Sequence, residues 1–119
     1  MQNNQDISKL LIEAIQDKKG SGIKLVNLEK IESAPVSKFI ICQGRSTSQV
    51  SAIADGIRED LQKSAGIKPY NYDGYRNSQW IVLDYGNILV HVFLPEYREF
   101  YNLEELWSDA VITDIPDIE

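Results

Sequence analysis

Few side chains in this 119-residue chain could do chemistry: it has one histidine, His91, and one cysteine, Cys42. His91 lies in an apolar run without the cluster of Cys or His ligands that a zinc site needs, so we expect no metal ion. It is then either a structural histidine or a contact to a partner. Cys42 also lies in an apolar run, with no histidine near it in sequence. This favours a small core residue over a nucleophile, unless the fold brings His91 beside it.

One glycine-serine turn could belong to an enzyme that binds phosphate groups. Gly44-Arg45-Ser46 follows an apolar run and precedes a helical pattern, and helix N-termini bind phosphates. Metal-assisted phosphoryl transfer, however, needs clustered carboxylates, and the expected hairpin supplies Asp84 alone. A nucleotidyltransferase-like enzyme acting at the Gly44–Ser46 turn is therefore our alternative function. The leading expectation is a protein with no catalytic residue and no cofactor.

The stretch from Trp80 to Phe93 should position the other candidates. Two runs rich in β-branched and aromatic residues flank Tyr85-Gly86 and predict a hairpin with these two residues as its loop. In that register Trp80 pairs with His91, and directly opposed residues share a face of the sheet. One face is then wholly aliphatic: Ile81, Leu83, Ile88, Val90 and Val92. The other is mixed: Trp80, Val82, Asp84, Asn87, Leu89, His91 and Phe93.

The mixed face has the composition of a recognition surface, because large aromatic groups stand beside polar and ionisable ones. The segment that follows it, residues 97–101, again mixes aromatic with charged side chains. We expect dimer or partner contacts there from Tyr97, Arg98 and Tyr101. Partner contacts on the hairpin are expected from Trp80, Val82, Asp84, Leu89 and His91.

Composition narrows the class of partner. The formal net charge is −6, from 12 basic and 18 acidic residues. This balance argues against direct nucleic-acid binding, which depends on Lys and Arg, and favours a basic protein. No stretch approaches the ~20 apolar residues of a membrane span, and no signal peptide is visible. A single cysteine allows no internal disulfide, so we expect the reducing cytoplasm.

The order of expected elements predicts the α+β class. A helix over 6–18 with Asp6 as N-cap, strands at 23–28 and 38–43, and a helix begun by a capping box at Ser46 precede the hairpin. A short strand at 70–72 comes before the hairpin, and short helices follow it at Pro95 and at 103–107. These elements predict a mixed β-sheet with helices packed on one face, the aliphatic one. We expect one domain over residues 1–112 and an acidic, flexible tail over 113–119.

Read together, these motifs resemble the ribosomal silencing factor family, also called Iojap or YbeB, over about residues 6–110. Each motif is weak alone, and their order and spacing are specific. They are Phe39-Ile-Ile-Cys-Gln-Gly44 with Ser46, Gln49-Val50, Ala52-Ile-Ala-Asp55, Asp73-Gly74, Trp80-Ile-Val-Leu-Asp-Tyr-Gly86, Val90-His-Val-Phe93, Arg98, Tyr101, Leu103-Glu-Glu-Leu-Trp107 and Asp109-Ala110.

The resemblance implies a nucleotidyltransferase-like core without catalytic carboxylates, often found as a homodimer. It implies binding to ribosomal protein L-fourteen on the large ribosomal subunit, a block of subunit joining, and lower translation in starvation or stationary phase. The family usually has Asp at the positions of Ser37 and Asn87 and Glu at that of Asp73, so two of these three charges are lost here. A general protein adaptor with no ribosomal partner is the third alternative.

Overall fold

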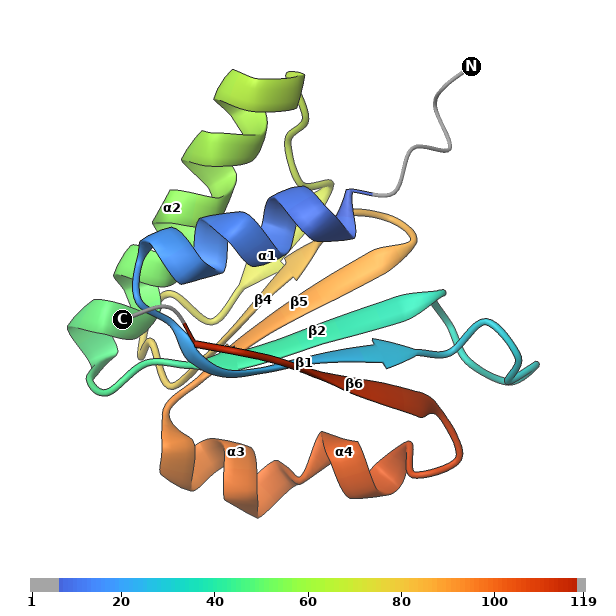
Figure 1. Ribbon diagram of the computed structural model, residues 1–119. Helices are drawn as coiled ribbons and strands as arrows, with labels where there is room; N and C mark the ends of the chain where they lie inside the picture. The colour runs from blue at the N-terminus through green and yellow to red at the C-terminus, as the bar shows by residue number, and fades with distance from the viewer. Residues whose placement is uncertain (1–6, 118–119) are drawn as a thin grey trace.

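A computed structural model describes residues 7–117, so the expected N-cap Asp6 and residues 118–119 of the expected tail lie outside the described residues. Most of the expected helices and strands are present, with small shifts at their ends (Figure 1). The elements are α1 (Ser8–Asp17), β1 (Ser21–Asn27), β2 (Lys38–Gln43), α2 (Thr47–Ala65), β3 (Asn71–Asp73), β4 (Trp80–Asp84), β5 (Ile88–Phe93), α3 (Pro95–Tyr101), α4 (Leu103–Leu106) and β6 (Val111–Ile115).

The strands form one mixed sheet in the order β3-β4-β5-β2-β1-β6. The central pair β2 and β5 is parallel, and every other neighbouring pair is antiparallel. β2 is buried along most of its length, as its continuous apolar run predicts for a central strand. The expected α+β class with a mixed sheet is therefore confirmed.

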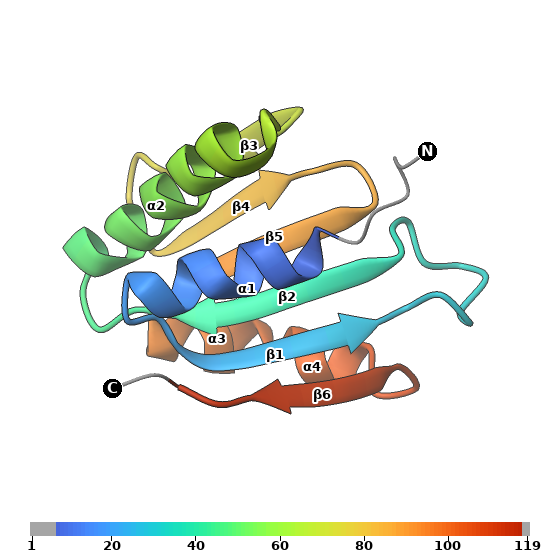
Figure 2. The same ribbon diagram turned by 45° about the horizontal axis from the view of Figure 1, so that its top comes forward.

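The two longer helices pack on the aliphatic face of the sheet, as expected (Figure 2). They meet it with stripes of apolar residues at helical spacing, which the strands complete into one closed cluster. Neither helix, nor any other described helix, is long and apolar enough to cross a membrane. The fully buried members of this cluster include Leu11, Ile15, Ile23, Ile40, Cys42, Val50, Ile53, Ile57, Leu61, Ile81, Leu83, Val90 and Val92.

The opposite face differs from our expectation, because it is not left open. The short helices α3 and α4 lie against it, as Figure 1 shows below the sheet. Pro95 begins α3 as predicted, and Asn102 separates the two helices in a left-handed conformation with φ +49°. These helices close a second, smaller cluster around Phe39, Ile41 and Phe93. Helices therefore pack on both faces of the sheet.

The hairpin register also differs from the prediction. Trp80 pairs with Phe93 rather than His91, and the Tyr85 N–H donates to the Ile88 carbonyl at 2.9 Å, so the loop is Gly86-Asn87. Gly86 takes φ +91°, and glycine at the first loop position is typical of a tight hairpin. Asp84 Oδ1 accepts from the Gly86 N–H at 2.8 Å and fixes this turn. The pairing moves by two residues, so both faces keep the composition that we predicted.

The expected flexible tail is wrong for residues 113–115. They belong to the edge strand β6, which pairs antiparallel with β1 from Asn27↔Val111 to Ile23↔Ile115. Beyond the strand, Asp117 Oδ1 accepts from the Gly22 N–H at 3.1 Å and anchors the chain further. The acidic composition of residues 108–119 concealed the short apolar pattern of Val111, Ile112 and Ile115.

Candidate partner-binding site

Trp80 lies half-buried at the start of β4, on the face that α3 and α4 cover in part. Its ring stacks on Phe93 with a centroid distance of 5.0 Å and meets Tyr101 of α3 at 4.6 Å. Its Nε1–H donates a hydrogen bond to Nδ1 of His91 at 3.0 Å. The indole is thus held on several sides and still reaches the surface, which suits an aromatic anchor for a partner.

His91 is not at the surface, because only 5% of the residue is exposed. Burial lowers the pKa of its imidazole from 6.5 to about 4, so the ring is neutral at physiological pH. Its Nε2 is buried and has no hydrogen-bond partner among the described residues. The sequence grouped His91 with the partner contacts, and the structure places it beneath them.

Val82, Asp84 and Leu89 share the face of Trp80 and are half-buried. Val82 and Asp84 lie beside β3, where they pair with exposed Asp73 and Asn71, and Leu89 of β5 pairs with Asp84 from the other side. The structure therefore groups four of the five predicted hairpin contacts, Trp80 included, on the part of this face that stays accessible.

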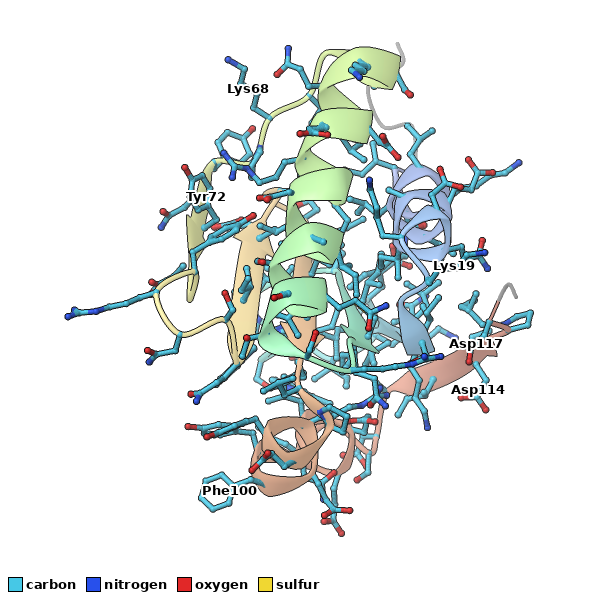
Figure 3. The ribbon with its side chains drawn as sticks, turned by 90° about the vertical axis from the view of Figure 1, so that its left-hand side faces the viewer. Lys19, Lys68, Tyr72, Phe100, Asp114 and Asp117 are labelled. Atoms are coloured by element: carbon cyan, nitrogen blue, oxygen red, sulfur yellow. The ribbon has the colours of Figure 1, made fainter. Side chains whose placement is uncertain are left out.

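The exposed side of α3 continues this surface. A hollow of about 250 Å³ is lined by Glu96, Tyr97, Phe100 and Tyr101. Phe100 is 79% exposed, and its ring projects away from the helix (Figure 3). Phe100 is not among the contacts predicted from the sequence, although a phenylalanine between Glu99 and Tyr101 in a short helix is a usable signal. Because Tyr101 touches Trp80, the hairpin and the helix form one continuous aromatic surface.

Arg98, a predicted contact on the same helix, has a different position. It is 9% exposed, and its guanidinium donates to the Gly22 carbonyl at 2.6 Å and to Gln43 Oε1 at 3.1 Å. It also forms an ion pair with Glu104 at 2.9 Å. Gly22, with φ +59°, has no Cβ and so leaves room for this contact. A Cβ at this position would lie only 2.6 Å from a guanidinium nitrogen. Arg98 therefore ties α3 and α4 to the sheet instead of facing a partner.

The Gly44–Ser46 turn, on which the alternative enzymatic function depends, has a structural role. Ser46 Oγ accepts from the Gln49 N–H at 3.1 Å, and Gln49 Oε1 accepts from the Arg45 N–H, so the predicted cap of α2 is confirmed. Within residues 7–117 no group of three or more His, Cys, Asp or Glu is placed to hold a metal ion. Burial raises the pKa of the Cys42 thiol to about 12, and its side chain lies on the sheet face opposite to that of His91.

A second surface hollow, of about 390 Å³, lies between α2 and β3. Arg58 of α2 is placed 4.0 Å from the centre of the Tyr72 ring, and both line this hollow. Figure 3 shows Tyr72 and Lys68 on this side of the molecule. The lining holds two acidic and two basic residues, so it offers no net charge to a partner. The lining residues are Asp55, Arg58, Glu59, Gln62, Lys68, Pro69 and Tyr72.

Comparison with known proteins gives a consistent result. Residues 1–119 match the family described as "Ribosomal silencing factor during starvation". Ribosomal silencing factor RsfS of Bacillus subtilis is 36% identical over 113 residues, which are 95% of this chain and 94% of that protein. Protein Iojap of Zea mays is 40% identical over 78 residues, which are 66% of this chain and 33% of that protein.

Two solved structures have the same fold. A crystal structure of a Chromobacterium violaceum protein has a TM-score of 0.81 at 38% identity, covering 87% of this chain and 85% of its own. A crystal structure of a Bacillus halodurans protein has a TM-score of 0.76 at 34% identity, covering 98% of this chain and 99% of its own.

Proposed function

Because the chain belongs to the ribosomal silencing factor family, we propose that it binds the large ribosomal subunit through ribosomal protein L-fourteen. Bound on the joining face of that subunit, it keeps the small subunit away by steric exclusion. It represses translation in this way in the cytoplasm of starved or stationary-phase cells. The function needs no catalysis, metal or cofactor, and direct contacts to nucleic acid contribute little.

The half-buried Trp80 indole is the observation that carries this proposal. An aromatic ring backed by Phe93 and Tyr101 and hydrogen-bonded to His91 is already ordered before binding, so its burial by a partner costs little side-chain entropy. Val82 and Leu89, half-buried on the same face, add apolar area, and exposed Phe100 extends the patch along α3. Such a cluster is the arrangement from which an interface draws most of its affinity.

Charge around this patch supports a basic partner. Arg98 is the only basic residue between Glu96 and Asp109, and its charge is paired with Glu104. The acidic side chains that remain exposed around the two short helices are Glu96, Glu99, Glu105 and Asp109. Opposite charge on the ribosomal protein would speed encounter and set orientation more than it would tighten the final complex. Binding should therefore slow as salt rises.

Co-sedimentation of the full chain with purified large ribosomal subunits tests the proposal. Alanine at an aromatic anchor typically costs about 2–4 kcal/mol, so Trp80→Ala should weaken binding about 30- to 1,000-fold. Wild-type chain left in the supernatant, or Trp80→Ala that sediments like wild type while folded, would contradict the proposal. A subunit-joining assay with purified small subunits then tests the steric block itself.

Two tyrosines provide a matched control. Tyr101 and Tyr72 are each 46% exposed, one beside Trp80 and the other beside α2. Tyr101→Ala should weaken subunit binding, whereas Tyr72→Ala should bind as wild type does. Equal losses from both variants would indicate a general effect of removing a surface aromatic.

A homodimer is part of the proposal, as the family resemblance implies. Tyr97 and Tyr101 line the hollow on α3 and are its candidate contacts. Sedimentation equilibrium should then show a dimer that Tyr101→Ala weakens and Tyr72→Ala does not. If self-association and ribosome binding use the same tyrosine, added large subunits will convert dimer into subunit-bound monomer.

A further inference from the structure

We propose that His91 is a positioning residue, which holds the Trp80 indole in its binding orientation and does not itself touch the partner. The inference depends on the proposed function, because it concerns the residue that anchors the complex. It changes the role that the sequence suggested for His91 from surface contact to support.

The hydrogen bond between the two rings fixes which histidine nitrogen carries the proton. Trp80 Nε1 can only donate, so Nδ1 of His91 must accept and must be unprotonated. The neutral ring then carries its hydrogen on Nε2, the nitrogen that is buried without a hydrogen-bond partner among the described residues. Leaving that N–H unsatisfied costs stability, and this cost is tolerated where the other nitrogen has a specific task.

The histidine ring is itself rigidly placed. It packs edge-to-face with the Phe39 ring at a centroid distance of 4.8 Å and lies nearly parallel to the Phe93 ring at 6.2 Å. β4 and β5 place Val82 directly opposite His91, while Trp80 pairs with Phe93. The His91 imidazole therefore contacts the indole diagonally, because Trp80 belongs to the next cross-strand pair on the same face. Its hydrogen bond holds the indole against the Phe93 ring.

The Trp80 side chain needs such support because only part of it is enclosed. Ring stacking on Phe93 and contact with Tyr101 set the plane of the indole, but neither contact uses Nε1, so neither decides which edge of the indole that nitrogen occupies. A hydrogen bond at Nε1 selects one orientation. Loss of that selection should weaken binding about 3- to 10-fold, the usual effect of ordering one side chain on association.

Three substitutions separate the acceptor from the ring. His91→Asn places an amide oxygen near the position of Nδ1 and keeps the acceptor. His91→Gln places its amide farther out, near the position of Nε2, and His91→Phe keeps a ring with no acceptor. We expect His91→Asn to restore indole orientation in part, and the other two variants to lose it. Thermal unfolding of each variant identifies any that fails to fold.

Two tryptophans, Trp80 and Trp107, give two indole N–H signals in a ¹H–¹⁵N spectrum, and Trp107→Phe assigns them. In the wild type and in His91→Asn, the Trp80 signal should show slow exchange with water. In His91→Phe it should exchange faster and move toward the position of a free indole. An unchanged Trp80 signal in folded His91→Phe would overturn the inference, whether or not the chain binds ribosomes.

A double-mutant cycle with purified large subunits tests the effect on binding. His91→Phe should weaken binding 3- to 10-fold in the wild-type chain and have no effect in a Trp80→Phe background, which has no indole N–H to hold. An equal loss in both backgrounds would show a general structural effect and overturn the positioning role. Failure of the wild-type chain to bind would instead refute the proposed function, and the indole spectrum would still decide the role of His91.

Discussion

The two faces of the sheet are built differently. Beneath α1 and α2 the side chains are aliphatic and fully buried, with Ile81, Leu83 and Val92 at 0% exposure. Beneath α3 and α4 the cluster is smaller and mixes aliphatic with aromatic side chains, and Trp80 and Leu89 remain half-buried. The first face stabilises the fold. The second face is only partly covered, and the part that stays accessible is the surface that we propose a partner binds.

The difference follows from the lengths of the covering helices. α2 has 19 residues and α1 has 10, whereas α3 has 7 and α4 has 4. Short helices have little stability of their own and depend on contacts such as those of Arg98. A short covering layer leaves part of the sheet open, and it can be altered without loss of the main core.

Substitutions at neighbouring positions of β4 test this contrast most strongly. Ile81→Ala removes a side chain from the closed cluster and should destabilise the protein by about 2–5 kcal/mol. Val82→Ala, one residue along on the other face, should cost about 1 kcal/mol, because its site is open to solvent on one side. Urea unfolding of both variants measures the difference, and equal costs would contradict the contrast between the faces.

The pH dependence of stability sharpens the description of the second face. The pKa of His91 is lowered from 6.5 to about 4, so between these values the unfolded chain binds a proton that the folded chain does not. Stability should therefore rise with pH from about 4 to 6.5 and then level off, by up to about 3 kcal/mol. The His91→Asn variant should not show this rise in stability between about pH 4 and 6.5. Identical pH profiles for the two proteins would contradict a buried, neutral histidine.

The link between the two short helices and the sheet is tested through Arg98. Arg98→Met leaves Glu104 without its partner, and it removes donors from the Gly22 carbonyl and from Gln43. The expected loss of stability is about 2 kcal/mol, less than for a fully buried pair because Glu104 is partly exposed. Glu99→Gln on the same helix is the control and should be nearly neutral. Hydrogen exchange should show α3 opening first in Arg98→Met.

The smallest expected change in stability concerns Phe100. Because 79% of this residue is exposed, Phe100→Ser should alter the free energy of unfolding by less than about 0.5 kcal/mol. If the proposed surface is correct, it should still weaken large-subunit binding. A variant that binds normally would restrict the surface to Trp80 and its immediate neighbours.

Periodicity and turn chemistry predicted much of the fold. The apolar stripe of α2, its cap at Ser46 and the alternation along β4 and β5 each determine local structure directly. The loop was predicted as Tyr85-Gly86, but the hydrogen bond from Gly86 to Asp84 favours a loop that begins at the glycine. β6 was missed because its stability comes from pairing with β1, a partner distant in sequence.

The candidate site was predicted by composition and corrected by burial. Trp80, Val82, Asp84 and Leu89 are grouped on one accessible surface as the alternation predicted. The same alternation could not show that His91 would be buried, or that Arg98 would turn inward to Gly22, since both depend on tertiary packing. Conversely, the position of Phe100 between Glu99 and Tyr101 is a sequence signal, but only the exposure of its side chain assigns this residue to the surface.

The antiparallel pairing of β1 with β6 has a consequence for synthesis of this protein. Chains emerge with their N-terminal part first, so β1 is made long before the residues that cover its outer edge. Throughout that interval β1 presents unpaired N–H and C=O groups, which are a template for association with other nascent chains. The sheet is completed only when residues 111–115 are synthesised. A short segment near the C-terminus therefore protects a strand that is among the first to be made.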